Sequence, residues 1–506
     1  KTGQLYRGSK PVMWSPVEQT ALAEAEVEYA DRRATQIYVK FPVRSHNNER
    51  VLPSVSKNSS GTHLFSKEEL EGVSLVIWTT TPWTIPANRA VSFSSNIEYG
   101  IYEVTEMEES EFEPWSKPGD KLLVADALWE TVAKAGLIKS ANRIESISTW
   151  NLAGMTLHHP LKNMDGADGK YDFPVPLLEG SHVTADAGTG FVHTAPSHGE
   201  DDYVVWISNQ TKLECLGIDP VVPMTMDDSG CYTDVMPERF QGLDVIRTSG
   251  KKRGQDGKAN PEVLKALVET GNLLARGIMM LRDAHSWRSG APVIRRATPQ
   301  WFISMSKDGL RDKALKALET TGFVPPRGRN RLEAMINDRP DWLISRQRAW
   351  GVPITLIVHE DGRLHTDRTD ADAINARILA AVSEHGVDGW FETPLETLMP
   401  NDKDGWSKVS DILDVWFDSG CTHAFCLKSR DDLPDRADLY LEGSDQHRGW
   451  FQSSLLESCA VYGEAPYDNV LTHGFVMAND GRKMSKKLGN SVYPKDIIVK
   501  SGAEIL

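Results

Sequence analysis

Two lysines in the C-terminal part of the sequence have the spacing of a phosphate-binding pair. Lys483 and Lys486 lie three positions apart in a loop that glycines flank. The ammonium group of lysine is a point charge on a flexible stem, so it can follow a phosphate group through a reaction. The loop therefore predicts binding of a polyanion such as the triphosphate of ATP. A solvated basic loop without a ligand is the alternative for so short a motif.

A second group of polar residues follows a short apolar run. Residues 440–451 predict a strand, a turn and the start of a helix, and ligands of open α/β sheets bind where such strands end. Gly443 permits close approach of a ligand to the backbone. Glu442, Asp445 and Gln446 offer polar groups for a ribose or a base, and the helix start presents free amides to anions. A capped helix after a buried strand is the structural alternative.

Hydroxyl and imidazole groups gather in two earlier segments. Residues 78–89 read WTTTPWTIPANR and residues 188–203 read GTGFVHTAPSHGEDDY. Rows of threonine are also common in edge strands, which is the alternative for the first segment. The second segment has metal-binding residue types, but neither an H-E-x-x-H pattern nor thiol partners, so we predict no metal there. Positioned hydroxyls can orient a water molecule for attack without a covalent intermediate.

Four segments, in their order along the chain, resemble the second half of the catalytic domain of class I aminoacyl-tRNA synthetases. They read DWLISRQRAWGVPI from Asp341, DVWFDSG from Asp414, YLEGSDQHRGWF from Tyr440 and KMSKKLGN from Lys483. The last is similar to the KMSKS loop of that family, with Lys487 at a position where serine is usual. The resemblance implies that ATP and Mg²⁺ are bound and that ATP is served by His473, Lys483 and Lys486.

The same resemblance implies roles for the residues around the predicted strand end. The aminoacyl-adenylate would be contacted by Glu442, Gly443, Asp445 and Gln446. Trp416 would line the pocket for the side chain of the amino acid. No H-x-G-H motif of this family occurs in the sequence, and no anticodon-binding helical domain follows the lysine loop. We therefore expect the chain to be a fragment of a longer synthetase.

The threonine and histidine segments resemble the editing domain that is inserted into isoleucyl-tRNA synthetases. The valyl enzymes carry a different threonine motif, and the leucyl enzymes differ after the GTG turn. The resemblance implies attachment of isoleucine to tRNA(Ile) and hydrolysis of mischarged valyl-tRNA(Ile). Valyl specificity, and a non-catalytic tRNA-binding protein, are the alternatives. The implied roles are a cradle for the ester and water (Thr79, Thr80, Thr81), proximity to the terminal adenosine (Asn88), a limit on pocket size (His193) and a partner for the α-ammonium group (Asp202).

The elements that must position these groups predict an α/β protein. Residues 1–35 are expected to be a catalytic-domain segment and connection, with a helical stretch around 21–28. Short β-branched and aromatic runs over 36–276 predict an inserted mixed β/α, β-barrel-like editing domain. Alternating helical and strand patterns over 277–506 predict the second half of a Rossmann-type, parallel-sheet catalytic domain. A polar stretch at about 356–405 is expected to be a peripheral insertion.

Composition agrees with an ordinary globular enzyme. The net charge of −15 argues against indiscriminate coating of nucleic acid, although a local basic groove remains compatible with it. Five cysteines without paired spacing predict a reducing, cytoplasmic compartment and no zinc site in this chain. No apolar run has membrane-spanning length, so no membrane partner is expected. We expect a monomer whose partners are tRNA(Ile), isoleucine and ATP.

Overall fold

The structure is a computed structural model that describes residues 2–46, 70–401, 403–478, 481, 482, 484 and 489–505. Its contacts divide the chain into two compact units. Unit 1 comprises Lys1–Arg7 and Trp301–Leu506, and unit 2 comprises Gly8–Gln300. None of the helices in the described part of the chain combines the length and the apolarity that a membrane span requires.

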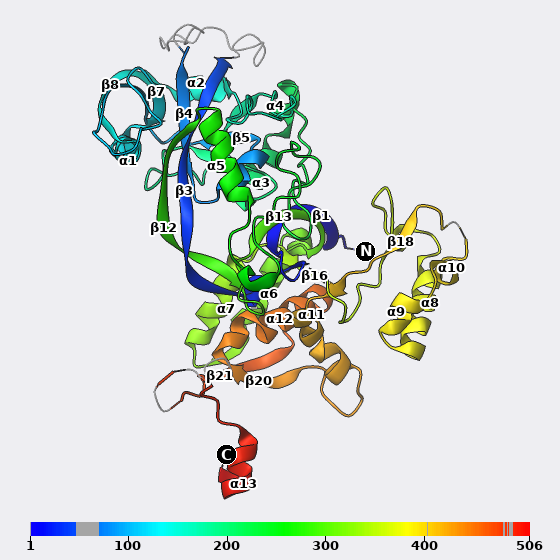
Figure 1. Ribbon diagram of the computed structural model, residues 1–506. Coiled ribbons are helices and arrows are strands. Elements are labelled where there is room, and N and C mark those ends of the chain that lie inside the picture. Colours follow the sequence, from blue (N-terminus) through cyan, green and yellow to red (C-terminus); the bar gives the residue numbers. More distant parts are fainter. Residues whose placement is uncertain are drawn as a thin grey trace. The chain divides into compact units, whose positions relative to one another are not determined.

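Unit 2 is built around one large mixed sheet (Figure 1). The pairs β5–β10 and β4–β7 are parallel, and the other pairs in this sheet are antiparallel. In spatial order, the strands are β11 (Val192–Thr194), β5 (Ala90–Phe93), β10 (Val175–Glu179), β9 (Met155–Leu157), β3 (Val27–His46), β4 (Val73–Thr79), β7 (Lys121–Ala125), β6 (Tyr99–Met107) and β8 (Ile138–Ile147), with β12 (Leu273–Ser286) paired to β3.

A two-stranded ribbon leads into this sheet and out of it. β3 and β12 pair antiparallel from Val27 opposite Ser286 to Ile37 opposite Arg276 and beyond. In the second half of β3, residues 37–42 pair with β4 and residues 43–46 pair with β9. The twenty-residue strand therefore belongs to the ribbon at one end and to the body of the sheet at the other.

Short helices and an aromatic core accompany the sheet. Tyr102 stacks on Trp129 with ring centroids 4.0 Å apart, beside the buried strand residues Val76, Leu122 and Val124. Strand β7 is buried continuously from Leu122 to Ala125, so both of its faces are covered. The helices of unit 2 are α1 (Trp129–Ala135), α2 (Thr149–Gly154), α3 (Glu200–Ser208), α4 (Gln210–Cys215) and α5 (Ala259–Glu269).

Unit 1 contains a parallel sheet in the order β14–β21–β20, which gives it α/β character. The strands are β14 (Gly322–Val324), β20 (Ala437–Gly443) and β21 (Tyr467–His473). Helix α12 packs against α6, and α6 packs against α7. Their shared core includes Leu332, Tyr440, Phe451 and Leu455. The bounds are α6 (Leu310–Glu319), α7 (Arg327–Asn337) and α12 (Trp450–Val461).

The remaining elements of unit 1 are short. β16 pairs with β19, and β17 pairs with β18. Around the second pair, Ile357, Ile374, Trp390 and Trp406 form a separate apolar cluster with α8, α9 and α10. The bounds are β15 (Trp342–Leu343), β16 (Ser345–Arg346), β17 (Ile357–His359), α8 (Ala371–His385), α9 (Asp388–Glu392), α10 (Leu395–Leu398), β18 (Trp406–Lys408), β19 (Ile412–Leu413), α11 (Val415–Gly420) and α13 (Pro494–Ser501). Two strands, β1 (Leu5–Ser15) and β13 (Ile294–Ile303), run through the boundaries between the units, and β2 (Thr20–Ala21) pairs with β1.

One local expectation is wrong. Residues 21–28 form no α-helix: a single 3₁₀ turn (Glu24–Glu26) leads directly into β3. The carboxylate of Glu26 is buried and accepts a hydrogen bond from the amide of Ala23 at 2.9 Å, which holds the turn. The strand, turn and helix start expected over 440–451 are confirmed. The bounds 36–276 for an editing domain stay a prediction, and Gln36 lies opposite Gly277 in the ribbon.

Candidate functional sites

The register of two short strands in unit 2 brings the threonine and histidine segments together. β11 pairs antiparallel with β5, so that His193 lies opposite Val91 and Thr194 opposite Ala90. The amide of Arg89 donates to the carbonyl of Thr194 at 2.9 Å and extends this pairing to the end of the threonine segment. His193 is thereby placed beside the turn Pro82–Ala87, which follows the three threonines.

Both ring nitrogens of His193 are bonded to residues in or next to that turn. Nδ1 lies 2.9 Å from the amide nitrogen Nδ2 of Asn88, and Nε2 lies 2.7 Å from Oγ1 of Thr84. Because an amide NH₂ can only donate, Nδ1 must accept, and Nε2 carries the proton. Burial, with a smaller contribution from the neighbouring His198, lowers the pKa of His193 to about 3. The ring is therefore neutral and fixed in orientation at physiological pH.

The threonine hydroxyls continue this hydrogen-bonded network, which we call the threonine–histidine cluster (Thr79, Thr81, Thr84, Asn88 and His193). Oγ1 of Thr81 lies 3.1 Å from Oγ1 of Thr79 and 3.4 Å from Oγ1 of Thr84. Oγ1 of Thr84 also donates to the carbonyl of Thr81 at 2.8 Å. The hydroxyl of the half-buried Thr80 differs, because it has no hydrogen-bond partner among the described residues. That hydroxyl is the one left for a ligand or a water molecule.

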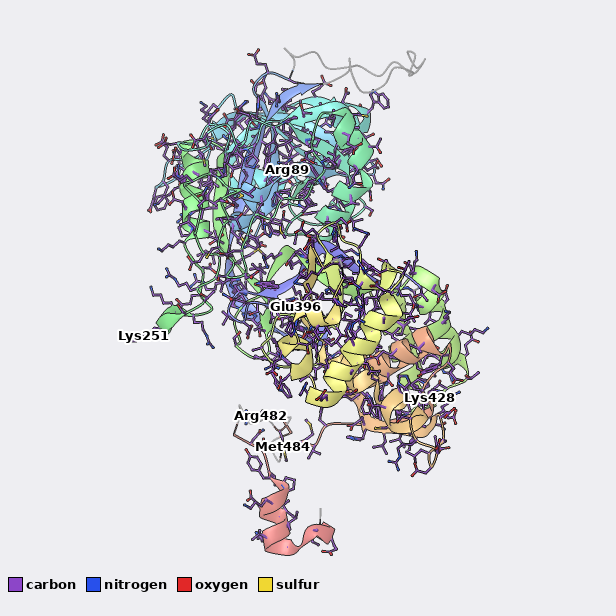
Figure 2. All side chains as sticks on the ribbon, turned by 90° about the vertical axis from the view of Figure 1, so that its right-hand side faces the viewer. Arg89, Lys251, Glu396, Lys428, Arg482 and Met484 are labelled. Carbon is purple, nitrogen blue, oxygen red and sulfur yellow. The ribbon has the colours of Figure 1, made fainter. Side chains whose placement is uncertain are left out.

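Asn88 is fully buried, with no exposed side-chain surface. Its Nδ2 also donates to the carbonyl of Ala90 at 2.8 Å. The next residue, Arg89, is half-buried and lies over the ring of Phe173 at 4.3 Å from its centroid. Figure 2 labels Arg89 and also Lys251, which lies in a short 3₁₀ turn (Gly250–Lys252) that projects outward. Because Nδ2 of Asn88 donates both to the carbonyl of Ala90 and to Nδ1 of His193, Asn88 holds the histidine ring in place. Neither this role nor the part played by Thr84 is indicated by any pattern in the sequence.

Asp202 comes from the same loop as His193 but makes its own contacts. It is the third residue of α3, and its Oδ2 accepts a hydrogen bond from the amide of Ala195 at 2.9 Å. A Cβ at Gly199 would lie 2.4 Å from that oxygen, so glycine is required for the carboxylate to fold back over the start of the helix. Burial raises the pKa of Asp202 to about 7, Asp201 adds to the rise, and the amide of Ala195 opposes it. The loop thus holds a carboxyl group that a nearby cation would ionise.

A second histidine of this loop, His198, is also fully engaged. Nδ1 lies 2.8 Å from the carbonyl oxygen of Arg295, and Nε2 lies 2.7 Å from Oγ1 of Thr225. Its ring stands edge-on to Trp83 with centroids 4.9 Å apart. Both nitrogens of His193 and of His198 therefore have protein partners, so neither ring has a free lone pair for a metal ion.

In unit 1, the parallel pairing of β20 and β21 aligns two of the predicted nucleotide-site residues. Gly443 lies opposite His473, and Glu442 opposite Thr472, where both strands end. A Cβ at Gly443 would lie 2.6 Å from Oδ1 of Asp445, so a larger residue would push that carboxylate aside. The side chains of Glu442 and His473 are exposed. Lys483 and Lys486 lie outside the described residues.

Trp416 and Gln446 meet across another glycine. A Cβ at Gly449 would lie 2.8 Å both from Cζ3 of Trp416 and from Oε1 of Gln446. The same Oε1 accepts from the amide of Trp450 at 3.1 Å, which fixes Gln446 at the start of α12. The indole N–H of Trp416 is buried without an acceptor among the described residues. Gln446, predicted to contact the adenylate, and Trp416, predicted to line the amino-acid pocket, are therefore neighbours.

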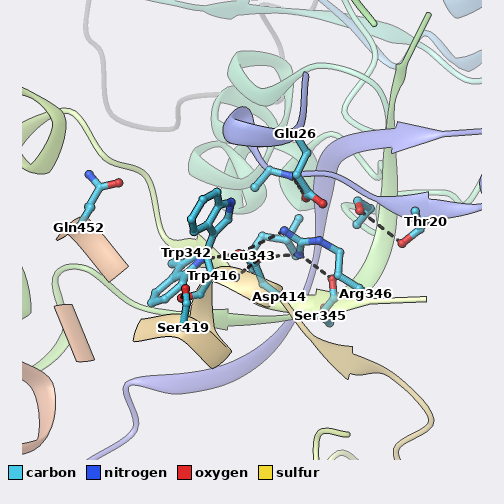
Figure 3. Close-up of polar contacts among 12 residues, drawn as sticks. Thr20, Glu26, Trp342, Leu343, Ser345, Arg346, Asp414, Trp416, Ser419 and Gln452 are labelled. Atoms are coloured by element: carbon cyan, nitrogen blue, oxygen red, sulfur yellow. Dashed lines mark hydrogen bonds and ion pairs between the residues drawn. The ribbon is translucent and has the colours of Figure 1, made fainter. Parts of the chain in front are cut away.

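A buried ion pair holds the helix that carries Trp416 (Figure 3). Asp414 caps α11 by accepting from the amide of Trp416 at 3.3 Å, and its other oxygen accepts from the indole of Trp342 at 3.2 Å. Nη2 of Arg346 lies 3.4 Å from Oδ2 of Asp414, and both side chains are 1% exposed. The DWLISRQR and DVWFDSG segments are thereby joined, although neither spacing nor residue type indicates these roles for Arg346 and Asp414.

Comparison with known proteins places these sites in a family context. The family model for class I tRNA synthetases (I, L, M and V) matches residues 1–506. An isoleucine–tRNA ligase of Caulobacter vibrioides is 52% identical over 515 residues, which cover 100% of this chain and 49% of the relative. An isoleucine–tRNA ligase of Mesorhizobium japonicum is 51% identical over 518 residues, covering 100% and 51%.

The chain thus spans about half the length of the curated relatives that it matches. Among solved structures, the ternary complex of Agrobacterium radiobacter K84 agnB2 LeuRS with tRNA and LeuAMS matches 99% of this chain and 52% of that chain. The sequence identity is 14% and the TM-score is 0.31.

Proposed function

The chain belongs to the class I tRNA synthetases, and on that premise we propose that it provides part of an ATP-dependent isoleucine–tRNA ligase that also hydrolyses valyl-tRNA(Ile). The likeness to isoleucine–tRNA ligases over the full chain supports isoleucine as the amino acid. The observation that carries the proposal is the presence of two separate groups of polar residues, one at the strand ends of unit 1 and one in the threonine–histidine cluster of unit 2.

In the synthetic site, the parallel strands of unit 1 act as the second half of a Rossmann-type domain. ATP, as its magnesium complex, is served by His473, Lys483 and Lys486, and the ammonium groups of the two lysines stabilise the polyphosphate while pyrophosphate leaves. Glu442, Gly443, Asp445 and Gln446 contact the adenylate. The aromatic face of Trp416 bounds the pocket for the isoleucine side chain, and the buried Asp414–Arg346 pair keeps that face in position.

A second site is needed because of the chemistry of the substrate. A pocket that surrounds isoleucine rejects valine poorly, since valine merely lacks one methylene; this pair of amino acids is the standard case of that limit. A smaller pocket that admits valine and excludes isoleucine can remove the error by hydrolysis. We assign this pocket to the inserted editing domain, with bounds of about 36–276.

The geometry of the cluster suits exclusion rather than proton transfer. His193 is neutral, and both nitrogens are bonded, so its ring acts as a fixed wall and not as an acid or a base. The free hydroxyl of Thr80 orients the attacking water, with Thr79 and Thr81 holding the turn around it. Asp202 binds the α-ammonium group of the misacylated amino acid, and Asn88, near the terminal adenosine, supports the wall.

The test uses the intact protein and two assays. ATP–pyrophosphate exchange is measured with isoleucine, valine and leucine, and deacylation is measured on valyl-tRNA(Ile) and isoleucyl-tRNA(Ile). We expect exchange to have the highest kcat/KM with isoleucine, and deacylation to consume valyl-tRNA(Ile) selectively. A preference for valine in exchange would replace the proposal with the valyl alternative. Binding of tRNA with neither activity would identify a non-catalytic tRNA-binding protein.

A further inference from the structure

A cationic cavity of about 410 Å³ lies in unit 1 beside the ends of β14 and β21. Its polar lining comes from α7, from the turn after β20 and from the end of β21. None of the described residues that line it is acidic. The polar lining residues are Arg327, Arg331, Ser444, His447, Thr472 and His473.

The arginines of α7 fall into two classes. Arg329 donates to three backbone carbonyls, those of Leu318, Glu319 and Thr321, and so has a structural task. Arg327 and Arg331 are exposed and form neither a hydrogen bond nor an ion pair with any described residue. Two uncompensated guanidinium groups therefore face the cavity, and a guanidinium fork matches the geometry of a phosphate group.

His447 gives an independent indication that the cavity takes a ligand. Its side chain is 2% exposed, and Nδ1 lies 2.8 Å from the carbonyl oxygen of Ser444, to which it donates. Nε2 is buried and has no hydrogen-bond partner among the described residues. A Cβ at Gly328 would lie 3.1 Å from Nε2, so this atom points at the first turn of α7, which lines the cavity. Buried polar atoms in native proteins normally have partners, which a ligand can supply.

We propose that this cavity binds a phosphate group, held by Arg327 and Arg331 and completed by a hydrogen bond to Nε2 of His447. The site rests on the proposed function, because Ser444 and His473 belong to the strand ends that are assigned to the nucleotide. The phosphate comes either from the polyphosphate of ATP and its pyrophosphate product or from the backbone of tRNA. Both sources present the same chemistry to the arginines, and the experiment separates them.

Phosphate binding is coupled to protonation of His447. Burial lowers the pKa of His447, the charge of Arg331 lowers it further, and the carbonyl of Ser444 and Asp445 oppose these effects. The charged groups that face the ring are Arg331 on α7 and Asp445 on its own turn, with Arg327 and His473 also lining the cavity. A bound phosphate accepts a hydrogen bond, so Nε2 must take up a proton to donate one. Binding therefore strengthens as pH falls.

The experiment is calorimetric titration of the intact protein with three probes: pyrophosphate, ATP and tRNA(Ile). The variants are Arg331→Gln, Arg327→Gln/Arg331→Gln, His447→Gln and Gly328→Ala, whose added methyl group would press on Nε2 of His447. The matched control is Lys316→Gln, which removes an exposed cation from the neighbouring helix α6. Circular dichroism and the melting temperature show whether each variant is folded.

If the phosphate belongs to ATP, the double arginine variant weakens pyrophosphate and ATP binding about tenfold or more, and tRNA binding is unchanged. If it belongs to tRNA, pyrophosphate binding is unchanged, and the slope of log K against log salt for tRNA decreases by about one for each arginine–phosphate interaction that the substitutions remove. In either case, titrations in buffers of different ionisation enthalpy show proton uptake by the wild type and its loss in His447→Gln. Lys316→Gln behaves as the wild type.

Folded variants that bind all three probes like the wild type would overturn the proposal, as would equal losses in Lys316→Gln and Arg331→Gln. If the proposed synthetase function itself is wrong, the experiments give a different result. In that case the wild type shows no isoleucine-dependent pyrophosphate exchange, whereas the titrations still report whether the cavity binds phosphate.

Discussion

In the threonine–histidine cluster the ring nitrogens and three of the hydroxyls are bonded within the protein, and Oδ1 of Asn88 is buried without a partner among the described residues. At the strand ends of unit 1, by contrast, the polar side chains make few bonds to the protein. His193 uses both nitrogens on Asn88 and Thr84, and the hydroxyls of Thr79 and Thr81 face each other. At the strand ends, Glu442 and His473 are exposed, and the indole N–H of Trp416 has no acceptor among the described residues. A site that is already bonded can act through shape, because its side chains cannot adapt to a larger ligand. A site with free donors and charges acts through the hydrogen bonds and ion pairs that form when its substrate binds.

The largest expected effect is at the buried ion pair that supports the strand-end site. Asp414→Asn removes a buried carboxylate partner of Arg346, and breaking a buried pair by removing one partner costs roughly 3–5 kcal/mol. We expect a matching loss in the free energy of unfolding, measured in urea, and a raised KM for isoleucine because Trp416 is no longer held in position. Asp418→Asn, on the same helix, is the control. An unfolding free energy equal to that of the wild type would remove the pair from this role.

Substitutions in the lysine loop should lower the activity that we assign to unit 1 and leave the activity that we assign to unit 2 unchanged. In the intact protein, Lys483→Ala and Lys486→Ala should each slow isoleucine activation about 10²- to 10³-fold, the usual effect of removing a group that stabilises transition-state charge. Deacylation of valyl-tRNA(Ile) should be nearly unchanged. The measurements are pyrophosphate exchange and deacylation on the same preparation, with Lys495→Ala as a control. Parallel losses of both activities would contradict the assignment of the lysines to one site.

Asp202→Asn tests whether the carboxylate near the start of α3 binds the α-ammonium group by its charge. The change keeps the size of the side chain and removes its charge. We expect valyl-tRNA(Ile) deacylation to fall about hundredfold, since a hydrogen bond to a charged group contributes roughly 1.5–3 kcal/mol. Activation of isoleucine should be unaffected. Glu200→Gln, at the first residue of α3, is the matched control. Near-normal deacylation by Asp202→Asn would leave the residue with a structural role alone.

His193→Ala tests whether shape is what the cluster provides. If the ring is the wall that excludes isoleucine, its removal should increase hydrolysis of isoleucyl-tRNA(Ile) about tenfold or more, because an extra methylene gains only about 0.8 kcal/mol in a roomy apolar pocket and cannot itself cause rejection. Thr84→Val, which removes one anchor of the ring, should give a smaller increase. Valyl- and isoleucyl-tRNA are compared side by side. A folded variant that still spares isoleucyl-tRNA would exclude His193 from the wall.

A change of pH from about 8 to 7 should give the smallest effect, since it only halves the contribution of Asp202. The pKa of Asp202 is raised to about 7, so its carboxyl group loses its charge as pH falls through that value. The ratio of wild-type to Asp202→Asn deacylation rates removes the titration of the substrate itself. We expect this ratio to be at its maximum above about pH 8, to be roughly half of that near pH 7, and to approach one at lower pH. A ratio that stays constant across this range would show that the charge of Asp202 is not used.

Sequence could predict local elements and residue types, but not the bonds between distant segments. The apolar runs at 36–43, 75–80 and 99–104 correspond to β3, β4 and β6, and the amphipathic stretch at 311–319 lies in α6. Each of these signals is contained in one short window. The contact of Asn88 with His193 joins residues 105 positions apart and depends on the register of β5 against β11, which no local pattern specifies.

The failed expectation over 21–28 has the same physical origin. A run of alanine and glutamate has high helix propensity, yet tertiary context decides marginal segments. The buried carboxylate of Glu26 and the pairing of Val27 with Ser286 select a turn and a strand instead. The role of Asp414 could not be predicted for a related reason: its partner Arg346 comes from another segment, and a buried ion pair leaves no spacing signature.

The ribbon of β3 and β12 also sets the path of the chain into and out of the large sheet. Val27 and Ser286 are direct partners across the ribbon, so the chain leaves and returns within one interstrand spacing, about 5 Å. In the path of the backbone, everything between those two residues takes the place of a hairpin turn. This segment also bonds to residues outside the ribbon: the amide of Ala297 donates to the carbonyl of Ser197, and the indole of Trp14 donates to the carbonyl of Asp228. It is therefore held at its base by the residues that flank it as well as by the ribbon.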